Sequence, residues 1–105
     1  MLIKREPKLP PGGYGYIKVG SKYSALVELD DYIQQGKYHW RPKRKKKKIY
    51  AVRRFVRNGK TYEISMHRAI MHSRPGEEPH HKNHNSLDNR KCNLENVPHN
   101  NHPRY

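Results

Sequence analysis

Histidines and amides gather at one end of this sequence. Seven of the eight histidines lie from His67 onward, and in the stretch 79–102 they alternate with Asn, Asp and Leu, which distinguishes them from a tag-like tract. Imidazole titrates near neutral pH and binds divalent metals, so such a stretch can supply both a general base and metal ligands. It is more polar than a hydrophobic core can use, and we therefore interpret 79–102 as an active site.

Two neighbouring histidines suit different roles. His80 and His81 fall in an expected strand, so their side chains point to opposite faces. A metal site needs two or more donors brought together, and His80 with His102 would supply them if the chain folds back on itself.

Polar residues of the following loop have structural roles in this interpretation. Asp88 and Asn89 are expected to shape the loop through bonds from side chain to backbone. Arg90 either holds a phosphate or pairs with Asp88, and the sequence does not decide between these two roles.

The charge of the chain points to a polyanionic partner. There are 23 Lys and Arg against 9 Asp and Glu, which gives a formal net charge of +14. Nucleic acid is the commonest such partner, and no amphipathic basic helix supports an anionic membrane surface instead. Residues 41–60 hold no acidic residue, and the predicted DNA-contacting side chains there are Arg41, Lys43, Arg44, Lys45, Lys46, Lys47, Lys48, Arg53, Arg54, Arg57 and Lys60, with Arg90 added from the loop. Taken alone, the run from Lys43 to Lys48 fits a solvated, disordered loop equally well.

Size and cysteine content restrict the class of protein. A chain of 105 residues has room for one compact domain with a thin, aromatic-rich core. Cys92 is the only cysteine, so neither an intrachain disulfide nor a cysteine-based zinc site can form. Because neither a signal-peptide pattern nor an 18-residue apolar run occurs, we expect a cytoplasmic protein in a reduced setting.

The local patterns predict a strand-rich chain with short helices. Residues 1–13 are rich in Pro and Gly and are expected to form a flexible basic arm. In the first half of the chain we expect a hairpin of 14–19 and 23–29, a helix 31–35 and a strand holding 38–40. Asp30 and Asp31 offer an N-cap and a first-turn carboxylate for this helix, and Gly36 is placed to end it. The elements predicted after it are a hairpin whose strands flank an Asn58-Gly59 turn, a helix 66–72, a strand near 78–81, a loop 82–92, a strand near 94–97 and a helix from about His99.

Several of these residues resemble a known family. His81, Asn83, the run Leu87-Asp88-Asn89-Arg90 and the pair Asn93-Leu94 look like the motif of HNH nucleases, in particular the phage-type HNH homing endonucleases. A further likeness lies upstream, in the segments 25–32, 38–40, 50–53 and 66–71. The resemblance implies an α+β fold: a small β-rich N-terminal part, 14–66, that contacts DNA, followed by a ββα-metal (HNH) hairpin-helix motif, 67–105.

The resemblance also implies roles for individual residues. His81 would be the general base, Asn93 would brace the loop between the two strands, and His102 would bind the metal from the short helix. His80 stands where the family has a metal-binding Asp. One divalent ion is implied, Mg²⁺ or Mn²⁺ in the family, whereas two histidine ligands also suit Zn²⁺, Ni²⁺ or Co²⁺.

Further residues would support this site without contacting substrate. Asn83 and His84 are expected to brace His81, although His84, like His99, also fits a spare surface histidine. His67 is expected to be a hydrogen-bonded core or supporting histidine. Asp88 and Asn89 complete the predicted supporting set.

The sequence therefore predicts a divalent-metal-dependent endonuclease of HNH type that hydrolyses phosphodiester bonds of double-stranded DNA. It would act in the cytoplasm of a bacterial or phage-infected cell, nicking as a monomer and cutting both strands as a homodimer. One alternative is a non-catalytic basic nucleic-acid-binding protein with a metal-stabilised hairpin. Another is a ribosome-associated structural protein, which would bind RNA and carry no metal.

Overall fold

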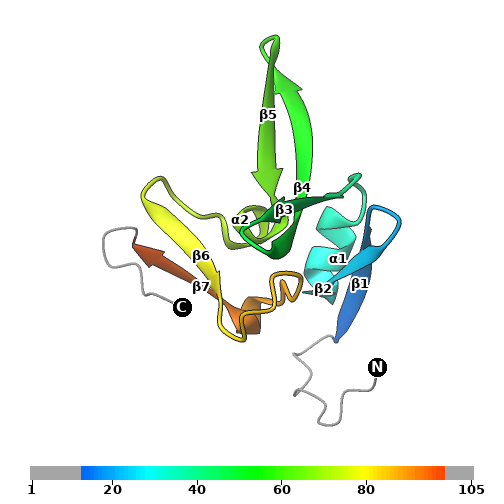
Figure 1. Ribbon diagram of the computed structural model, residues 1–105, viewed down its shortest axis with the longest axis vertical. Coiled ribbons are helices and arrows are strands. Elements are labelled where there is room, and N and C mark those ends of the chain that lie inside the picture. Colours follow the sequence, from blue (N-terminus) through cyan, green and yellow to red (C-terminus); the bar gives the residue numbers. More distant parts are fainter. Residues whose placement is uncertain (1–12, 99–105) are drawn as a thin grey trace.

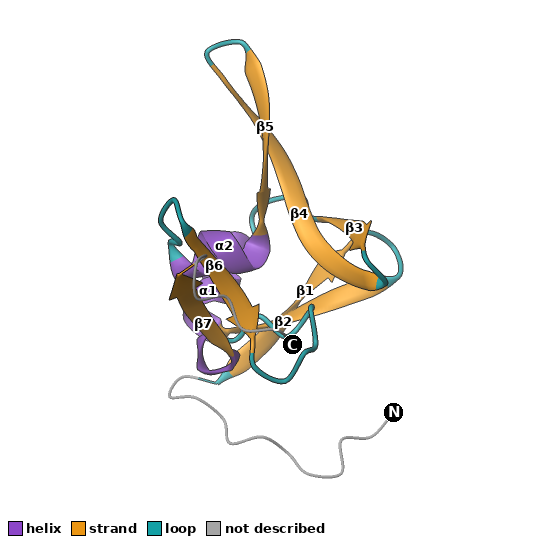
Figure 2. Ribbon diagram, turned by 60° about the vertical axis from the view of Figure 1, so that its left-hand side comes forward, coloured by secondary structure: helices purple, strands orange, loops and turns teal. Residues whose placement is uncertain are grey.

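The described part of the chain, residues 13–98, is a small α+β fold rich in strands (Figure 1). The structure is a computed structural model. Within this part, strands form three small antiparallel sheets, in the orders β1-β2, β3-β4-β5 and β6-β7, and two α-helices accompany them (Figure 2). The predicted arm, 1–13, apart from its last residue, and the predicted helix from His99 lie outside the described residues.

The first hairpin agrees with the prediction. Strand β1, Tyr14–Val19, pairs with β2, Tyr23–Glu28, in the antiparallel register that joins Val19 to Tyr23. The turn between them needs Gly20, because its φ is +67° and a Cβ there would lie 2.8 Å from Pro42 Cδ.

The first helix, α1, begins earlier than predicted. It spans Leu29–Gln35, so Asp30 is not the N-cap but lies in the first turn. Asp31 lies in the first turn as predicted, and both negative charges favour the helix dipole. Glu28 occupies the N-cap position without a side-chain capping bond. Gly36 ends the helix as predicted, and its N–H donates to Tyr32 O.

The predicted strand at 38–40 is wrong. Within it only Trp40 makes a β-bridge, an isolated one to Val19. Trp40 is fixed instead by burial, being 1% exposed, and by its Nε1–H, which donates to Gln35 O at 2.7 Å. Packing of the indole therefore decides the path of the chain here, and a ladder of backbone bonds does not form.

The second sheet is more ordered than predicted. Its strands are β3, Arg41–Lys45, β4, Lys48–Arg57, and β5, Lys60–Ser65. The run from Lys43 to Lys48 is not a disordered loop, because Lys46 and Lys47 adopt φ of 49° and 69° and form a two-residue hairpin turn. The predicted Asn58-Gly59 turn is confirmed, and the β4–β5 hairpin projects from the rest of the molecule (Figure 1).

The C-terminal half of the described chain begins with helix α2, Met66–Met71, which ends at His72 in the left-handed conformation. Strand β6, Glu77–His81, then pairs with β7, Leu94–Pro98, and the short 3-10 helix η1, Lys91–Asn93, leads into β7. These two strands agree with the predicted pair.

One hydrophobic cluster joins the three sheets and α2. Its buried members are Ile17, Val19, Ala25, Val27, Trp40, Ala51, Met66, Ile70 and Leu94. Because all three sheets contribute to this cluster and α2 contacts both β4–β5 and β6–β7, the helix joins the hairpin β6–β7 to the basic sheet β3–β4–β5. Within residues 13–98, neither helix is long and apolar enough to cross a membrane.

Candidate active site

The two residues with the most specific predicted roles flank the loop of the β6–β7 hairpin. His81 is the last residue of β6 and pairs with Leu94, the first residue of β7. Asn93 immediately precedes β7, and its backbone oxygen accepts a hydrogen bond from Lys82 N–H at 2.8 Å. The hairpin therefore brings His81 and Asn93 to the same end of the two strands.

The ring of His81 is oriented by an asparagine. Its Nε2 lies 2.7 Å from Asn89 Oδ1, and the exposed fractions of the two residues are 8% and 1%. Asn89 is itself fixed to the first hairpin, because its backbone N–H donates to Leu26 O at 2.7 Å. When Nε2–H donates to Asn89, the lone pair of His81 is on Nδ1.

Aromatic rings from two other elements surround this imidazole. The centroid of His67, on α2, lies 4.8 Å from that of His81. Tyr50, on β4, stacks on His67 with centroids 5.6 Å apart, and its centroid is 6.1 Å from that of His81. Tyr50 was not among the predicted site residues, because its contact with these imidazoles arises only when β4 packs against α2 and β6.

Burial keeps both imidazoles neutral near pH 7. It lowers the pKa of His67 to about 3, and the neighbouring His81 and Arg68 act in the same direction. Burial also lowers the pKa of His81, although the bond to Asn89 and the charge of Asp88 oppose this shift. His81 therefore has the protonation state that a general base requires.

Asn93 makes the contacts expected of a residue that braces the loop. Its Nδ2 donates to Asn83 Oδ1 and to Asp88 O, both at 2.9 Å, while its Oδ1 accepts from Asn83 N–H at 3.0 Å. Asn83 in turn donates from Nδ2 to Asp88 Oδ2 at 2.8 Å. Asn83 therefore supports the loop, and the side chain that holds His81 is Asn89.

Arg90 forms a buried ion pair with Asp88. Its Nε and Nη2 donate to the two carboxylate oxygens at 2.8 and 2.7 Å, and the two residues are 6% and 4% exposed. Of the two roles that the sequence left open for Arg90, this geometry favours the ion pair over a phosphate contact.

Only one of the two predicted metal ligands, His80, lies within the described residues. His80 is 9% exposed and pairs across the hairpin with Glu95, whereas His102 lies outside the described residues. Within residues 13–98 no group of three or more His, Cys, Asp and Glu side chains lies together in a metal-binding arrangement. His84 occupies an exposed turn with φ of 65°, and its backbone N–H donates to His81 O at 3.0 Å.

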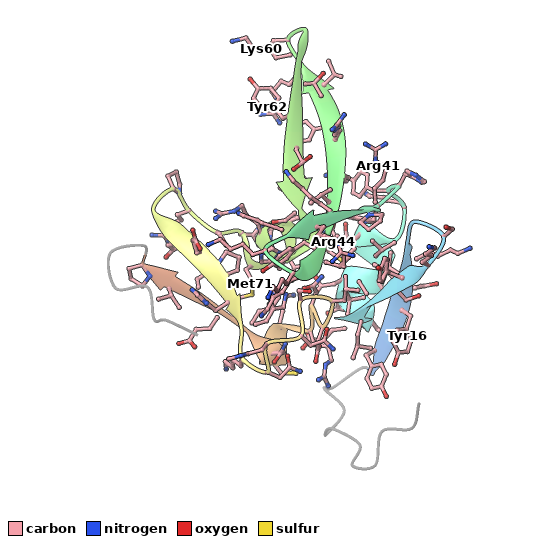
Figure 3. The ribbon with its side chains drawn as sticks, viewed as in Figure 1. Tyr16, Arg41, Arg44, Lys60, Tyr62 and Met71 are labelled. Atoms are coloured by element: carbon pink, nitrogen blue, oxygen red, sulfur yellow. The ribbon has the colours of Figure 1, made fainter. Side chains whose placement is uncertain are left out.

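The predicted DNA-contacting side chains, apart from Arg90, lie along β3, β4 and the turn between them, except Lys60, which begins β5 (Figure 3 labels Arg41, Arg44 and Lys60). The positive charges of two of these side chains are compensated by Glu63 on β5. The carboxylate oxygens of Glu63 lie 2.6 Å from Lys43 Nζ and 3.8 Å from Arg54 Nε. Lys48 Nζ donates to His84 O at 3.2 Å, so the basic sheet touches the loop that follows His81. The positive charges of Lys45 and Lys48 also help to lower the pKa values of His67 and His81, respectively.

Comparisons of this chain with protein-family models, with curated proteins and with solved structures find no match.

Proposed function

We propose that the chain is a divalent-metal-dependent DNA endonuclease of HNH type, acting on double-stranded DNA. The observation that carries this proposal is the placement of a neutral, oriented imidazole, His81, at the end of β6 beside the loop that Asn93 braces. The basic sheet that touches this loop supports a polyanionic substrate.

His81 supplies the base in this mechanism. Its Nδ1 takes the proton of the attacking water, while Nε2–H remains bonded to Asn89 Oδ1. Because Asn89 is buried and fixed to Leu26, the imidazole keeps one orientation during this transfer. Such preorganisation lowers the barrier, since the base spends no energy on reorientation when it reacts.

Both proposed metal ligands are histidines, which bind metals through imidazole nitrogen atoms. His80 with His102 would hold one divalent ion, and two nitrogen donors suit Zn²⁺, Ni²⁺, Co²⁺ or Mn²⁺. When bound, the ion supplies Lewis-acid stabilisation of charge on the phosphate and on the leaving oxygen.

The basic sheet positions the DNA in this proposal. Lys45 and Lys48 lie close enough to the site to influence the titration of His67 and His81, so a phosphate held by these lysines would lie beside the catalytic imidazole. One such site attacks one phosphodiester bond. A monomer therefore nicks, and cutting of both strands requires a homodimer or two successive events.

The deciding experiment is nicking of supercoiled plasmid by the His81→Ala variant. The chain is incubated with Mg²⁺, Mn²⁺, Ni²⁺ or Zn²⁺, and binding to a short duplex is measured in parallel. We expect His81→Ala to bind DNA normally and to lose at least about 100-fold in nicking rate with the best metal. His39→Ala is the matched control, because His39 is exposed and far from the β6–β7 loop in sequence. Unchanged nicking by His81→Ala would overturn the proposal.

The low exposure of His81, 8%, favours a second candidate, a basic DNA-binding protein that does not cleave. It predicts duplex binding without nicking by the unmodified chain under every metal in the panel.

A further inference from the structure

The β4–β5 hairpin extends away from the body of the protein as a two-stranded ribbon (Figures 1 and 2). We define its outer part, residues 53–64, as the arm, and the word no longer refers to the predicted N-terminal segment 1–13. The arm ends in the Asn58-Gly59 turn, and its outer residues from Val56 to Tyr62 are all exposed. It therefore offers a long surface that neither of the other two sheets covers.

The arm has two different faces, because successive side chains of a strand alternate and paired residues share a face. Cross-strand pairs join Phe55 to Tyr62, Arg57 to Lys60 and Arg54 to Glu63. One face, which we name the arginine–aromatic face, consists of Arg53, Phe55, Arg57, Lys60, Tyr62 and Ile64. The opposite face consists of Arg54, Val56, Thr61 and Glu63.

The positive charge of the arm is uncompensated on one face only. Glu63, on the opposite face, lies 3.8 Å from Arg54 and 2.6 Å from Lys43. The arginine–aromatic face carries three cationic side chains and no acidic one. A polyanion is therefore attracted to the arginine–aromatic face more strongly than to the other.

Aromatic rings order the arginines of this face. Phe55 and Tyr62 stack with centroids 5.5 Å apart, and the guanidinium carbons of Arg53 and Arg57 lie 5.6 and 5.8 Å from the Phe55 centroid. Arg53 also lies over the ring of Tyr38 at 3.7 Å. These cation–π contacts restrict the side chains before any ligand binds, so less conformational entropy is lost on binding.

We propose that the arm enters the major groove of double-stranded DNA with its arginine–aromatic face toward the base edges. The width of the major groove admits a two-stranded β-ribbon, and a guanidinium can donate two hydrogen bonds to the O6 and N7 atoms of guanine. Arg57 and Lys60, near the tip, would contact the bases farthest from the body of the protein (Figure 3 shows Lys60 and Tyr62 on the arm). This inference rests on the DNA-binding part of the proposed function and is independent of cleavage.

The first test measures the affinity of the full chain for a short random-sequence duplex in the presence of a chelator, so that cleavage plays no part. We expect Arg57→Ala to weaken binding about tenfold. Arg74→Ala removes the same charge from an exposed turn outside the arm, and we expect it to weaken binding less than about twofold. Arg54→Ala, on the opposite face, should have a smaller effect than Arg57→Ala. Equal losses for Arg54→Ala and Arg57→Ala would overturn the choice of face.

A second variant separates the contribution of the positive charge of Arg57 from its recognition of bases. Arg57→Lys keeps the positive charge but loses the planar pair of donors. Selection from a randomised duplex library should give a narrower base preference for the unmodified chain than for Arg57→Lys, even if both bind with similar affinity. Thermal melting verifies that each variant is folded. The same base preference in both would contradict base readout by Arg57.

The groove is identified by methylation interference. Methylation of guanine N7 lies in the major groove, whereas methylation of adenine N3 lies in the minor groove. Interference at guanine N7, weakened in Arg57→Ala, is the expected result. Interference confined to adenine N3, or tighter binding to an RNA duplex of the same sequence, would overturn the proposal. A chain that binds in this way but never nicks would contradict the proposed catalysis and leave this inference standing.

Discussion

Asn89 Oδ1 lies 2.7 Å from His81 Nε2, and Asn89 itself is only 1% exposed. The contact joins the loop of the β6–β7 hairpin to its first strand. Because the backbone of Asn89 is bonded to Leu26 on β2, the first hairpin of the chain indirectly fixes the imidazole. The β-rich N-terminal part therefore orients the candidate base.

Replacing Asn89 by Asp should shift the pH dependence of nicking. A carboxylate beside His81 favours the imidazolium form, so the pKa of His81, now lowered by burial, would rise. A base must be neutral to accept a proton, and the acidic limb of the rate profile should therefore move up by about 1–2 pH units. Nicking rates measured from pH 5 to 9 check this. Gln34→Glu introduces the same charge change on an exposed residue of α1 and should leave the limb in place. An unmoved limb in Asn89→Asp would show that the titrating group is not His81.

Stability should fall as the pH falls through the ordinary pKa of histidine. The pKa of His67 is about 3 in the folded protein against 6.5 in the unfolded chain, so between these values only the unfolded chain binds the proton. The linkage relation then gives a loss of up to about 1.4 kcal/mol per pH unit below 6.5. His67→Phe keeps a ring against Tyr50 but cannot titrate. Urea unfolding at a series of pH values should show that the free energy of unfolding changes less steeply with pH in this variant. An equally steep change would refute the assignment of the pH dependence to His67.

The ion pair of Asp88 and Arg90 should contribute far more than the surface pair of Lys43 and Glu63. Removing Asp88 leaves a buried, uncompensated guanidinium, which typically costs about 3–5 kcal/mol. The Lys43 side chain is 51% exposed, so its pair contributes about 0–1 kcal/mol. Urea unfolding of Asp88→Ala and Lys43→Ala tests this difference. Similar losses in the two variants would contradict the structural role given to Asp88.

Local signals in the sequence predicted much of the strand pattern. The first hairpin and the Asn58-Gly59 turn follow from alternation and from residues that tolerate positive φ. The turn at Lys46 and Lys47 could not be predicted in this way, because lysine has no preference for that conformation. There the pairing of β3 with β4 imposes the turn.

The candidate site was predicted in its residue types and only partly in its contacts. The hairpin that places His81 opposite Leu94 follows from the motif. The identity of the side chain that holds His81 does not, since Asn83 and His84 are closer to His81 in sequence than Asn89 is. That choice depends on the bond between Asn89 and Leu26, which joins residues 63 positions apart. The ring of Tyr50 against His67 is likewise a product of tertiary packing.

The distance along β4 predicts where a nick should fall relative to the bases that the arm contacts. Tyr50 packs at the candidate site and Arg57 lies seven residues further along the same strand. At about 3.3 Å per residue the separation is about 23 Å, or about seven base pairs. This prediction rests on both proposals. Sequencing of nicked products, compared with the guanines at which N7 methylation interferes, measures the separation.

Lengthening the arm provides the control for this spacing. Two residues added to each strand beside the Asn58-Gly59 turn preserve the alternation of faces and move the tip outward by about 7 Å. The nick should then move about two base pairs further from the interfering guanines. A nick at an unchanged separation would mean that the bases are recognised by another part of the chain, even if both binding and cleavage persist.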